Sequence, residues 1–143
     1  MRLRQVVVDT EDARGLAEFY RQLLGLEYRP GDEPEAGGDD EWLVLLGRDG
    51  GRELAFQQVP HLPVITWPDP AVAQMMHLDL DVATTAELDA GHERALALGA
   101  RLLEDRADDP EEPLRVYADP AGHPFCIFMA ADATFDRPPV AGG

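Results

Sequence analysis

The segment HLDLDV, residues 77–82, alternates polar and apolar residues with a period of two. This period is typical of a half-buried strand, with the leucines and the valine on one face and His77 and Asp79 on the other. The segment QVVVD, residues 5–9, also predicts a strand and begins with Gln5 where the other begins with His77. The chain therefore contains an internal repeat, and the same order of elements follows both segments.

A helix is predicted after each of these strands. The first carries an apolar stripe at helical spacing between a suitable N-cap, Asp12, and a stop at Gly25. The second begins with the capping-box pattern Thr84-x-x-Glu87 and stops at Gly99. Both helices are expected to lie on a sheet.

Three further strands follow each helix, so the sequence predicts two βαβββ modules. These strands are expected at 26–29, 42–46, 53–59, 100–104, 114–118 and 124–129. We predict an α+β fold in which two curved mixed sheets pair around a trough and the helices cover the outer faces. The expected parts are a first module at 1–60, a Pro-rich linker at 61–72, a second module at 73–131 and a flexible tail at 132–143.

The composition excludes several functions. A net charge of −16, from 28 acidic and 12 basic residues, argues against nucleic-acid binding, which depends on basic side chains. The chain has no serine, lysine or asparagine, which excludes a serine nucleophile, a Schiff-base lysine and a phosphate-loop lysine. Because Cys126 is the single cysteine and no apolar run could span a membrane, we expect a cytoplasmic protein.

Alternation along the strands decides which side chains line the predicted trough. The inward polar side chains are expected to be Gln5, Gln57, His77, Asp79 and Cys126. Aromatic rings in such a fold are usually core, but four could wall the trough: Trp42, Trp67, Phe128 and His61.

Three roles are open for His77: a metal ligand, a proton-transferring or ligand-binding group, and a structural side chain. Asp79 favours the second role. Because the two β-carbons lie roughly 7 Å apart along the strand, we predict that these side chains converge on a small ligand rather than on each other. Cys126 is interpreted as a small buried hydrophobe, unless His77 acts as its activating base. His92, in the middle of the second predicted helix, is expected to be exposed and is not a site candidate.

Nearly the whole chain, about residues 3–130, resembles the vicinal oxygen chelate superfamily, which includes glyoxalase I, extradiol dioxygenases and bleomycin-resistance proteins. The residues that carry the resemblance are QVVVDTEDARGLAEFYRQLLGL, HLDLDV and DPAGHPFCIF. The run LAFQQVP and a Trp-Pro-Asp-Pro linker are similar to a glyoxalase-like subgroup of actinobacterial character. The resemblance implies the two-module fold, a small-molecule ligand and a homodimer.

The resemblance also implies where a metal ion would bind. Metal-dependent members use four inward residues, one from the first and last strand of each module. Gln5 and His77 match two of these positions, but Ala55 and Cys126 stand where carboxylates are expected. We therefore predict a metal-free site, with a divalent metal at Gln5 and His77, joined by Cys126, as the lesser alternative.

Three functions remain open. The first is a metal-independent small-molecule-binding protein, and the second is a lyase, isomerase or dioxygenase. The third is a dimerisation module without a ligand, and whether the chain is an enzyme is left open. His77 and Asp79 are the predicted catalytic pair, and the predicted ligand contacts are Gln5, Gln57, Cys126 and Trp42.

Overall fold

The computed structural model describes residues 1–73 and 75–130, in two compact units with their boundary between Val64 and Ile65. The first unit contains β1 (Val6–Thr10), α1 (Ala13–Leu24), β2 (Glu27–Tyr28), a short 3-10 helix η1 (Pro34–Ala36), β3 (Trp42–Leu46) and β4 (Arg52–Gln58). The second contains β5 (Leu78–Val82), α2 (Thr85–Ala97), β6 (Arg101–Arg106), β7 (Leu114–Ala118) and β8 (Pro124–Met129). The predicted tail at 132–143 lies outside the described residues.

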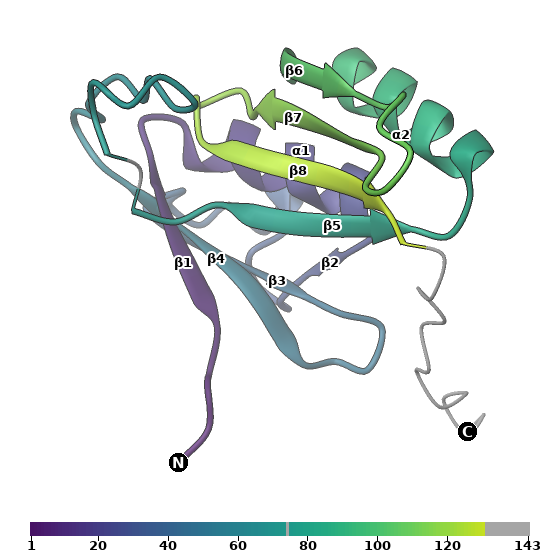
Figure 1. Ribbon diagram of the computed structural model, residues 1–143. Coiled ribbons are helices and arrows are strands. Elements are labelled where there is room, and N and C mark those ends of the chain that lie inside the picture. Colours follow the sequence, from purple (N-terminus) through teal and green to yellow (C-terminus); the bar gives the residue numbers. More distant parts are fainter. Residues whose placement is uncertain (74, 131–143) are drawn as a thin grey trace. The chain divides into compact units, whose positions relative to one another are not determined.

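Each unit is one βαβββ module with a four-stranded mixed sheet (Figure 1). The strand order is β1-β4-β3-β2 in the first sheet and β5-β8-β7-β6 in the second. In each sheet the first strand of the module pairs in parallel with the last, and the remaining pairs are antiparallel. The predicted α+β fold is confirmed. The trough between the modules stays a prediction.

Helix α1 begins and ends at the residues that the sequence indicates. The carboxylate of Asp12 accepts a hydrogen bond from the backbone N–H of Gly15 at 2.9 Å, and Gly25 ends the helix with a left-handed φ of 66°. The apolar stripe of α1 is buried, and the ring of Tyr20 stacks on Phe56 of β4 at 5.8 Å. This packing holds the helix on one face of the first sheet and leaves the other face uncovered by α1.

Helix α2 begins with the predicted capping box. The hydroxyl of Thr84 accepts from the backbone N–H of Glu87 at 3.1 Å, and the Glu87 carboxylate accepts from the N–H of Thr84 at 3.0 Å. The side chains of Leu88 and Ala95 are fully buried beneath the helix. Because two N–H groups at the helix start are satisfied at once, the box fixes the point at which β5 passes into α2.

A buried aspartate shapes the turn that leads into β8. The Asp119 side chain is almost completely buried and accepts hydrogen bonds from the backbone N–H groups of Ala121 and His123. Its carboxylate also lies 2.9 Å from Nδ1 of His123. His123 therefore has a structural role, and the turn sets where the residues of β8 enter the sheet.

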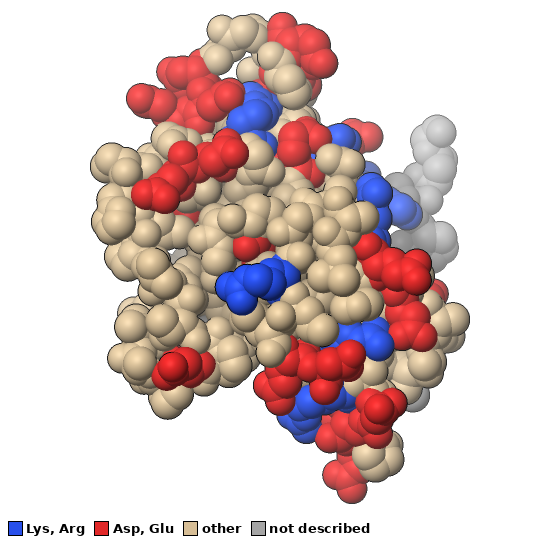
Figure 2. Space-filling model, turned by 90° about the horizontal axis from the view of Figure 1, so that it is seen from above, with Lys and Arg blue, Asp and Glu red and all other residues tan. Residues whose placement is uncertain are grey.

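The acidic loop before β3 is exposed to solvent, where its like charges are hydrated. Residues 35–42 are all exposed, and Asp40 pairs with Arg14 of α1 at 2.6 Å. The hydrogen bond from Arg14 lowers the pKa of Asp40. Figure 2 shows many acidic side chains on the face drawn, with fewer arginines between them. No helix among the described residues is long and apolar enough to cross a membrane.

The capping box yields a stability prediction. Thr84→Ala removes the acceptor for the N–H of Glu87, so we expect the free energy of unfolding to fall by about 1 kcal/mol. Thr85→Ala is the matched control, because the neighbouring hydroxyl contacts only the sulfur of Met129 in the described structure, and we expect a change within about 0.5 kcal/mol. Urea denaturation measures both variants, and equal losses would contradict a capping role.

Candidate functional site

Three chemically different side chains meet on the second sheet. His77 directly precedes β5, Asp79 lies within β5, and Cys126 lies within β8. The atoms of these side chains that could bind an ion all lie within 4.8 Å of one another. Nε2 of His77 is 3.2 Å from Oδ1 of Asp79. A nitrogen, an oxygen and a sulfur donor therefore share one small region within a single module.

The strand register explains why Asp79 and Cys126 meet. In the parallel pair β5–β8 these two residues are direct partners, and in the antiparallel pair β7–β8 Val116 is the partner of Cys126. The residue after Cys126 is Ile127, whose side chain lies close to Gly91 of α2. Because successive side chains of a strand point to opposite faces, Asp79, Val116 and Cys126 lie on the face that α2 leaves uncovered.

The indole of Trp67 forms an apolar wall beside this group. Its ring is nearly parallel to the imidazole of His77, with centroids 5.2 Å apart. Together with Leu103 and Phe128 it packs against the buried cluster that contains Val116 and Cys126. The side chains of His77 and Asp79 nevertheless remain 31% and 57% exposed, so solutes can reach them.

The thiol of Cys126 is held in its neutral form. Burial raises its pKa to about 11, and the nearby carboxylate of Asp79 contributes in the same direction. A thiol is a poor nucleophile until it ionises, so Cys126 is not an activated nucleophile at neutral pH. The interpretation of Cys126 as a small buried side chain is confirmed by its exposure of only 3%.

A family model described as a glyoxalase-like domain matches residues 5–128. The chain belongs to this glyoxalase-like family. A search of curated proteins gives no match to this chain.

Solved structures share the fold of this glyoxalase-like protein. A glyoxalase-related enzyme from Fulvimarina pelagi is 24% identical, with a TM-score of 0.62, and the match covers 91% of this chain and 88% of the other. A glyoxalase/bleomycin resistance protein/dioxygenase family enzyme from Burkholderia phytofirmans is 18% identical, with a TM-score of 0.63 and coverages of 90% and 98%. The fosfomycin resistance protein of Listeria monocytogenes, complexed with Mn(II) and 1S,2S-dihydroxypropylphosphonic acid, is 17% identical, with a TM-score of 0.65 and coverages of 90% and 92%.

Two expectations about histidines of the glyoxalase-like chain were wrong. His77 and Asp79 were predicted to converge on a ligand rather than on each other. Nε2 of His77 instead lies 3.2 Å from Oδ1 of Asp79, so the two side chains contact each other directly. The imidazole bridges the spacing along the strand because His77 turns toward Asp79 while stacked on Trp67. His92 was predicted to be exposed, yet it is half-buried and its Nδ1 lies 2.9 Å from the hydroxyl of Tyr117.

The other predicted ligand contacts lie on the first sheet. Gln57 and Trp42 are direct partners across β3 and β4, and both are exposed. Gln5 precedes β1, and its side-chain oxygen accepts a hydrogen bond from Arg52 at 3.1 Å. The structure therefore brings Gln57 and Trp42 together. The oxygen that Gln5 would offer to a ligand is instead hydrogen-bonded to Arg52.

The four-residue metal site implied by the family resemblance does not fit this chain. Ala55 is fully buried and its methyl group offers no ligand atom. The side-chain oxygen of Gln5 already accepts a hydrogen bond from Arg52. The positive charge of Arg52 would repel a cation at that oxygen. His77 and Cys126 remain from that set, and Asp79 lies beside them. The expected absence of a metal stays a prediction.

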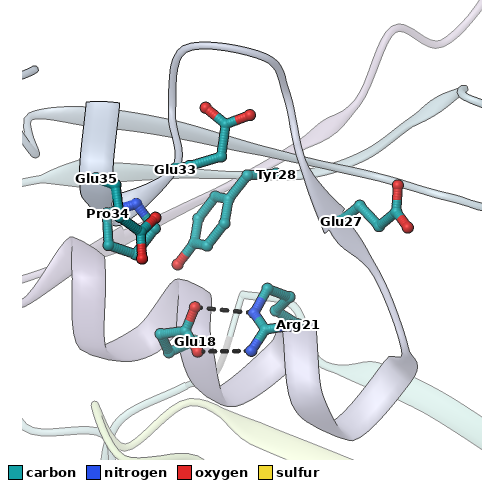
Figure 3. A pocket seen from close by; sticks show the side chains of 7 residues that line it. All are labelled: Glu18, Arg21, Glu27, Tyr28, Glu33, Pro34 and Glu35. Carbon is teal, nitrogen blue, oxygen red and sulfur yellow. Dashed lines mark hydrogen bonds and ion pairs between the residues drawn. The ribbon is translucent and has the colours of Figure 1, made fainter. Parts of the chain in front are cut away.

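The first module has a hollow of about 400 Å³ that sequence reasoning did not identify. It is lined by Glu18, Arg21, Glu27, Tyr28, Glu33, Pro34 and Glu35 (Figure 3). Glu18 and Arg21 form an ion pair at 2.8 Å along one side of α1. The Tyr28 hydroxyl is buried with no hydrogen-bond partner within the described structure, and burial raises its pKa to about 12. This hollow is mainly an acidic surface and lacks the combination of donors found around Cys126.

The environment of Cys126 predicts slow alkylation. We expect its rate of reaction with iodoacetamide to rise with a midpoint near pH 11, well above the value of about 8.5 for an ordinary cysteine. Because the folded pKa is raised, the stability that the neutral thiol contributes is complete below its ordinary pKa and is lost as the pH approaches about 11. Mass spectrometry after timed alkylation measures the rate.

Asp79→Asn tests the cause of this shift. The substitution removes a negative charge beside the thiol, so the alkylation midpoint should move to lower pH. Asp108→Asn, in an exposed loop of the same module, is the matched control, and its alkylation midpoint should equal that of the wild type. An unchanged midpoint in Asp79→Asn would contradict a contribution of Asp79, and a wild-type midpoint at or below that of ordinary cysteine would contradict the effect of burial.

Proposed function

We propose that this glyoxalase-like chain binds a small molecule on the uncovered face of the second sheet. His77 and Asp79 would supply the polar contacts, and Trp67 the apolar wall. The observation that carries the proposal is the His77–Asp79 pair, with Nε2 and Oδ1 3.2 Å apart, beside an apolar surface and still accessible.

The pair is suited to hold a ligand in one orientation. A carboxylate at this distance favours the tautomer in which Nε2 of His77 carries a proton, and it restricts rotation of the ring. The stacked indole restricts the same ring from its face. Polar groups fixed in this way lose little conformational entropy when a ligand binds.

Charge and surroundings favour a ligand with both an apolar part and a cationic or amine-bearing part. Asp79 provides a partly exposed carboxylate, and the net charge of the chain is −16. An indole can bind apolar groups by contact and cations through its ring face. The fosfomycin resistance protein that shares this fold supports a role in binding a small antibiotic-like compound, which we include in the proposal.

The proposal extends to the first module and to a second copy of the chain. Gln57 and Trp42 are adjacent and exposed on the first sheet, and they would offer an amide and an aromatic contact to a ligand bound on that module. Gln5 could join them if its bond to Arg52 opened. We also propose a homodimer, as the family resemblance implies.

The same pair supports a second candidate function, proton transfer within a lyase, isomerase or related enzyme. A histidine oriented by a carboxylate is a recurrent arrangement for a general base. His77 would accept the proton of a bound substrate, and Asp79 would stabilise the imidazolium that forms. Exchange of ligand hydrogens for deuterium in D₂O, followed by proton NMR, distinguishes this enzyme from a protein that only binds.

The binding proposal is tested with a fixed panel of small aromatic amines and antibiotic-like compounds. Compounds that raise the melting temperature of the wild-type chain are titrated by calorimetry into His77→Ala and Asp79→Asn. We expect each substitution to weaken binding at least tenfold, because each removes a charge-assisted contact of about 1.5–3 kcal/mol. Circular dichroism checks that the variants remain folded.

One variant controls this experiment. Asp108→Asn removes an exposed carboxylate from a loop of the second module. It should bind like the wild type. If His77→Ala and Asp79→Asn bind every active compound with unchanged affinity, the site lies elsewhere, and if no compound stabilises the wild type the proposal loses its support.

A further inference from the structure

We propose that His77, Asp79 and Cys126 form a binding site for a thiophilic divalent metal ion, with Zn²⁺ the best match, contained within the second module. The inference deepens the proposed function, because it concerns the same site. It keeps His77 and Cys126, which stand at two of the four positions implied by the family resemblance, but it takes its third ligand from Asp79 of the same module instead of from the first module.

The His77–Asp79 separation is close to that of two ligands of a bound ion. Zn²⁺ lies about 2.0–2.2 Å from nitrogen and oxygen ligands, so two such ligands of a tetrahedral ion are about 3.4 Å apart. Nε2 of His77 and Oδ1 of Asp79 are 3.2 Å apart, close to that separation. The sulfur of Cys126 lies within 4.8 Å of its two neighbours. At a Zn–S distance of about 2.3 Å it would need to approach them by at most about 1.3 Å.

The donor types select the class of metal. Imidazole nitrogen and thiolate sulfur favour Zn²⁺ and its neighbours Co²⁺ and Ni²⁺, whereas Mg²⁺ and Ca²⁺ prefer oxygen ligands. Cys126 is the single cysteine of the chain. Its coordination would therefore be the one source of a metal–thiolate signal, which makes the site directly observable.

Metal binding would change the chemistry of Cys126. The S–H bond breaks, its proton leaves to solvent, and the thiolate forms a bond to the ion without any change of oxidation state. Asp79 is the direct strand partner of Cys126, so its carboxylate attracts the cation that replaces the proton.

The surroundings would hold the ligands in place. Trp67 stacks on His77, and the side chains of Leu114 and Val116 pack around Cys126. An apolar environment strengthens the attraction between the ion and its ligands. Three protein ligands leave the fourth tetrahedral position open, as in zinc sites that bind water or substrate. The amine-bearing part of a ligand could bind there through its neutral nitrogen.

This inference departs from the sequence-based expectation of a metal-free cavity. That expectation considered Gln5, His77 and Cys126 as ligands, and it did not include Asp79. The register of β5 against β8 brings Asp79 to Cys126, and the ion-pair contact brings it to His77. The third donor therefore comes from the same module as the other two.

The test uses the full chain, purified without an affinity tag, kept reduced and treated with a chelator that is then removed. Co²⁺ is titrated while the near-ultraviolet absorption is recorded, because Co²⁺ bound to thiolate gives a charge-transfer band there. We expect one equivalent of Co²⁺ to produce this band and Zn²⁺ to displace it. Zn²⁺ should also raise the melting temperature of the chain.

Variants assign the ligands. Cys126→Ser should abolish the band, and His77→Ala and Asp79→Asn should each weaken Co²⁺ binding at least tenfold. Asp108→Asn, in an exposed loop of the same module, is the matched control and should bind as the wild type does. Cys126→Ala is measured alongside Cys126→Ser, so that a folding defect of one variant does not decide the result.

The outcomes separate the metal site from the proposed function. Absence of the band at one equivalent of Co²⁺, or unchanged Co²⁺ affinity in Cys126→Ser and Cys126→Ala, would overturn the metal site. Compounds that bind the chelator-treated wild type but not Asp79→Asn would still support the proposed function in that case. A thiolate band without binding of any compound would support the metal site and contradict the proposed function.

Discussion

The parallel pairing of β5 with β8 is the constraint on which the candidate site depends. Each βαβββ module closes by placing its last strand beside its first, so residues that are far apart in sequence become direct neighbours. In the second module this pairing sets Asp79 opposite Cys126, 47 positions along the chain. The buried Asp119 turn fixes where β8 begins, and the capping box of α2 fixes where β5 ends. Two local motifs thereby set a long-range contact.

The first module has the same pairing but different chemistry. There β1 pairs in parallel with β4, and Val7 is the partner of Ala55. The corresponding pair in the second module consists of a carboxylate and a thiol. The polar residues of the first module are instead exposed, as in Gln57, or bonded within the module, as in Gln5. The two modules therefore repeat the same strand order, but the side chains at equivalent positions differ in chemistry.

Local signals predicted the fold well because the physics that sets them is local. The caps of both helices lie where Asp12, Gly25, Thr84 and Glu87 indicate, and strands β3, β7 and β8 have the predicted bounds. Each of these features depends on hydrogen bonds or backbone angles within a few residues. Sequence periodicity can therefore identify them without knowledge of the tertiary structure.

The site was predicted less completely because it depends on rotamers and on strand register. His77, Asp79 and Cys126 were recognised as inward residues, but the His77–Asp79 contact was not, since β-carbon spacing does not determine where long side chains turn. The exposure of His92 was misjudged because the Tyr117 hydroxyl comes from a distant strand. Trp67 was only one of several possible wall residues, since nothing local shows that the predicted linker packs on the second sheet.

That packing of Trp67 has a consequence for how the protein can change over evolution. The wall of the site belongs to the segment before β5, while its floor belongs to β7 and β8. Substitutions in the segment can reshape the space beside His77 while the hydrogen bonds of the sheet stay intact, because Trp67 lies outside the strands. The wall of the proposed site can therefore diverge while the strands that carry Asp79 and Cys126 are maintained.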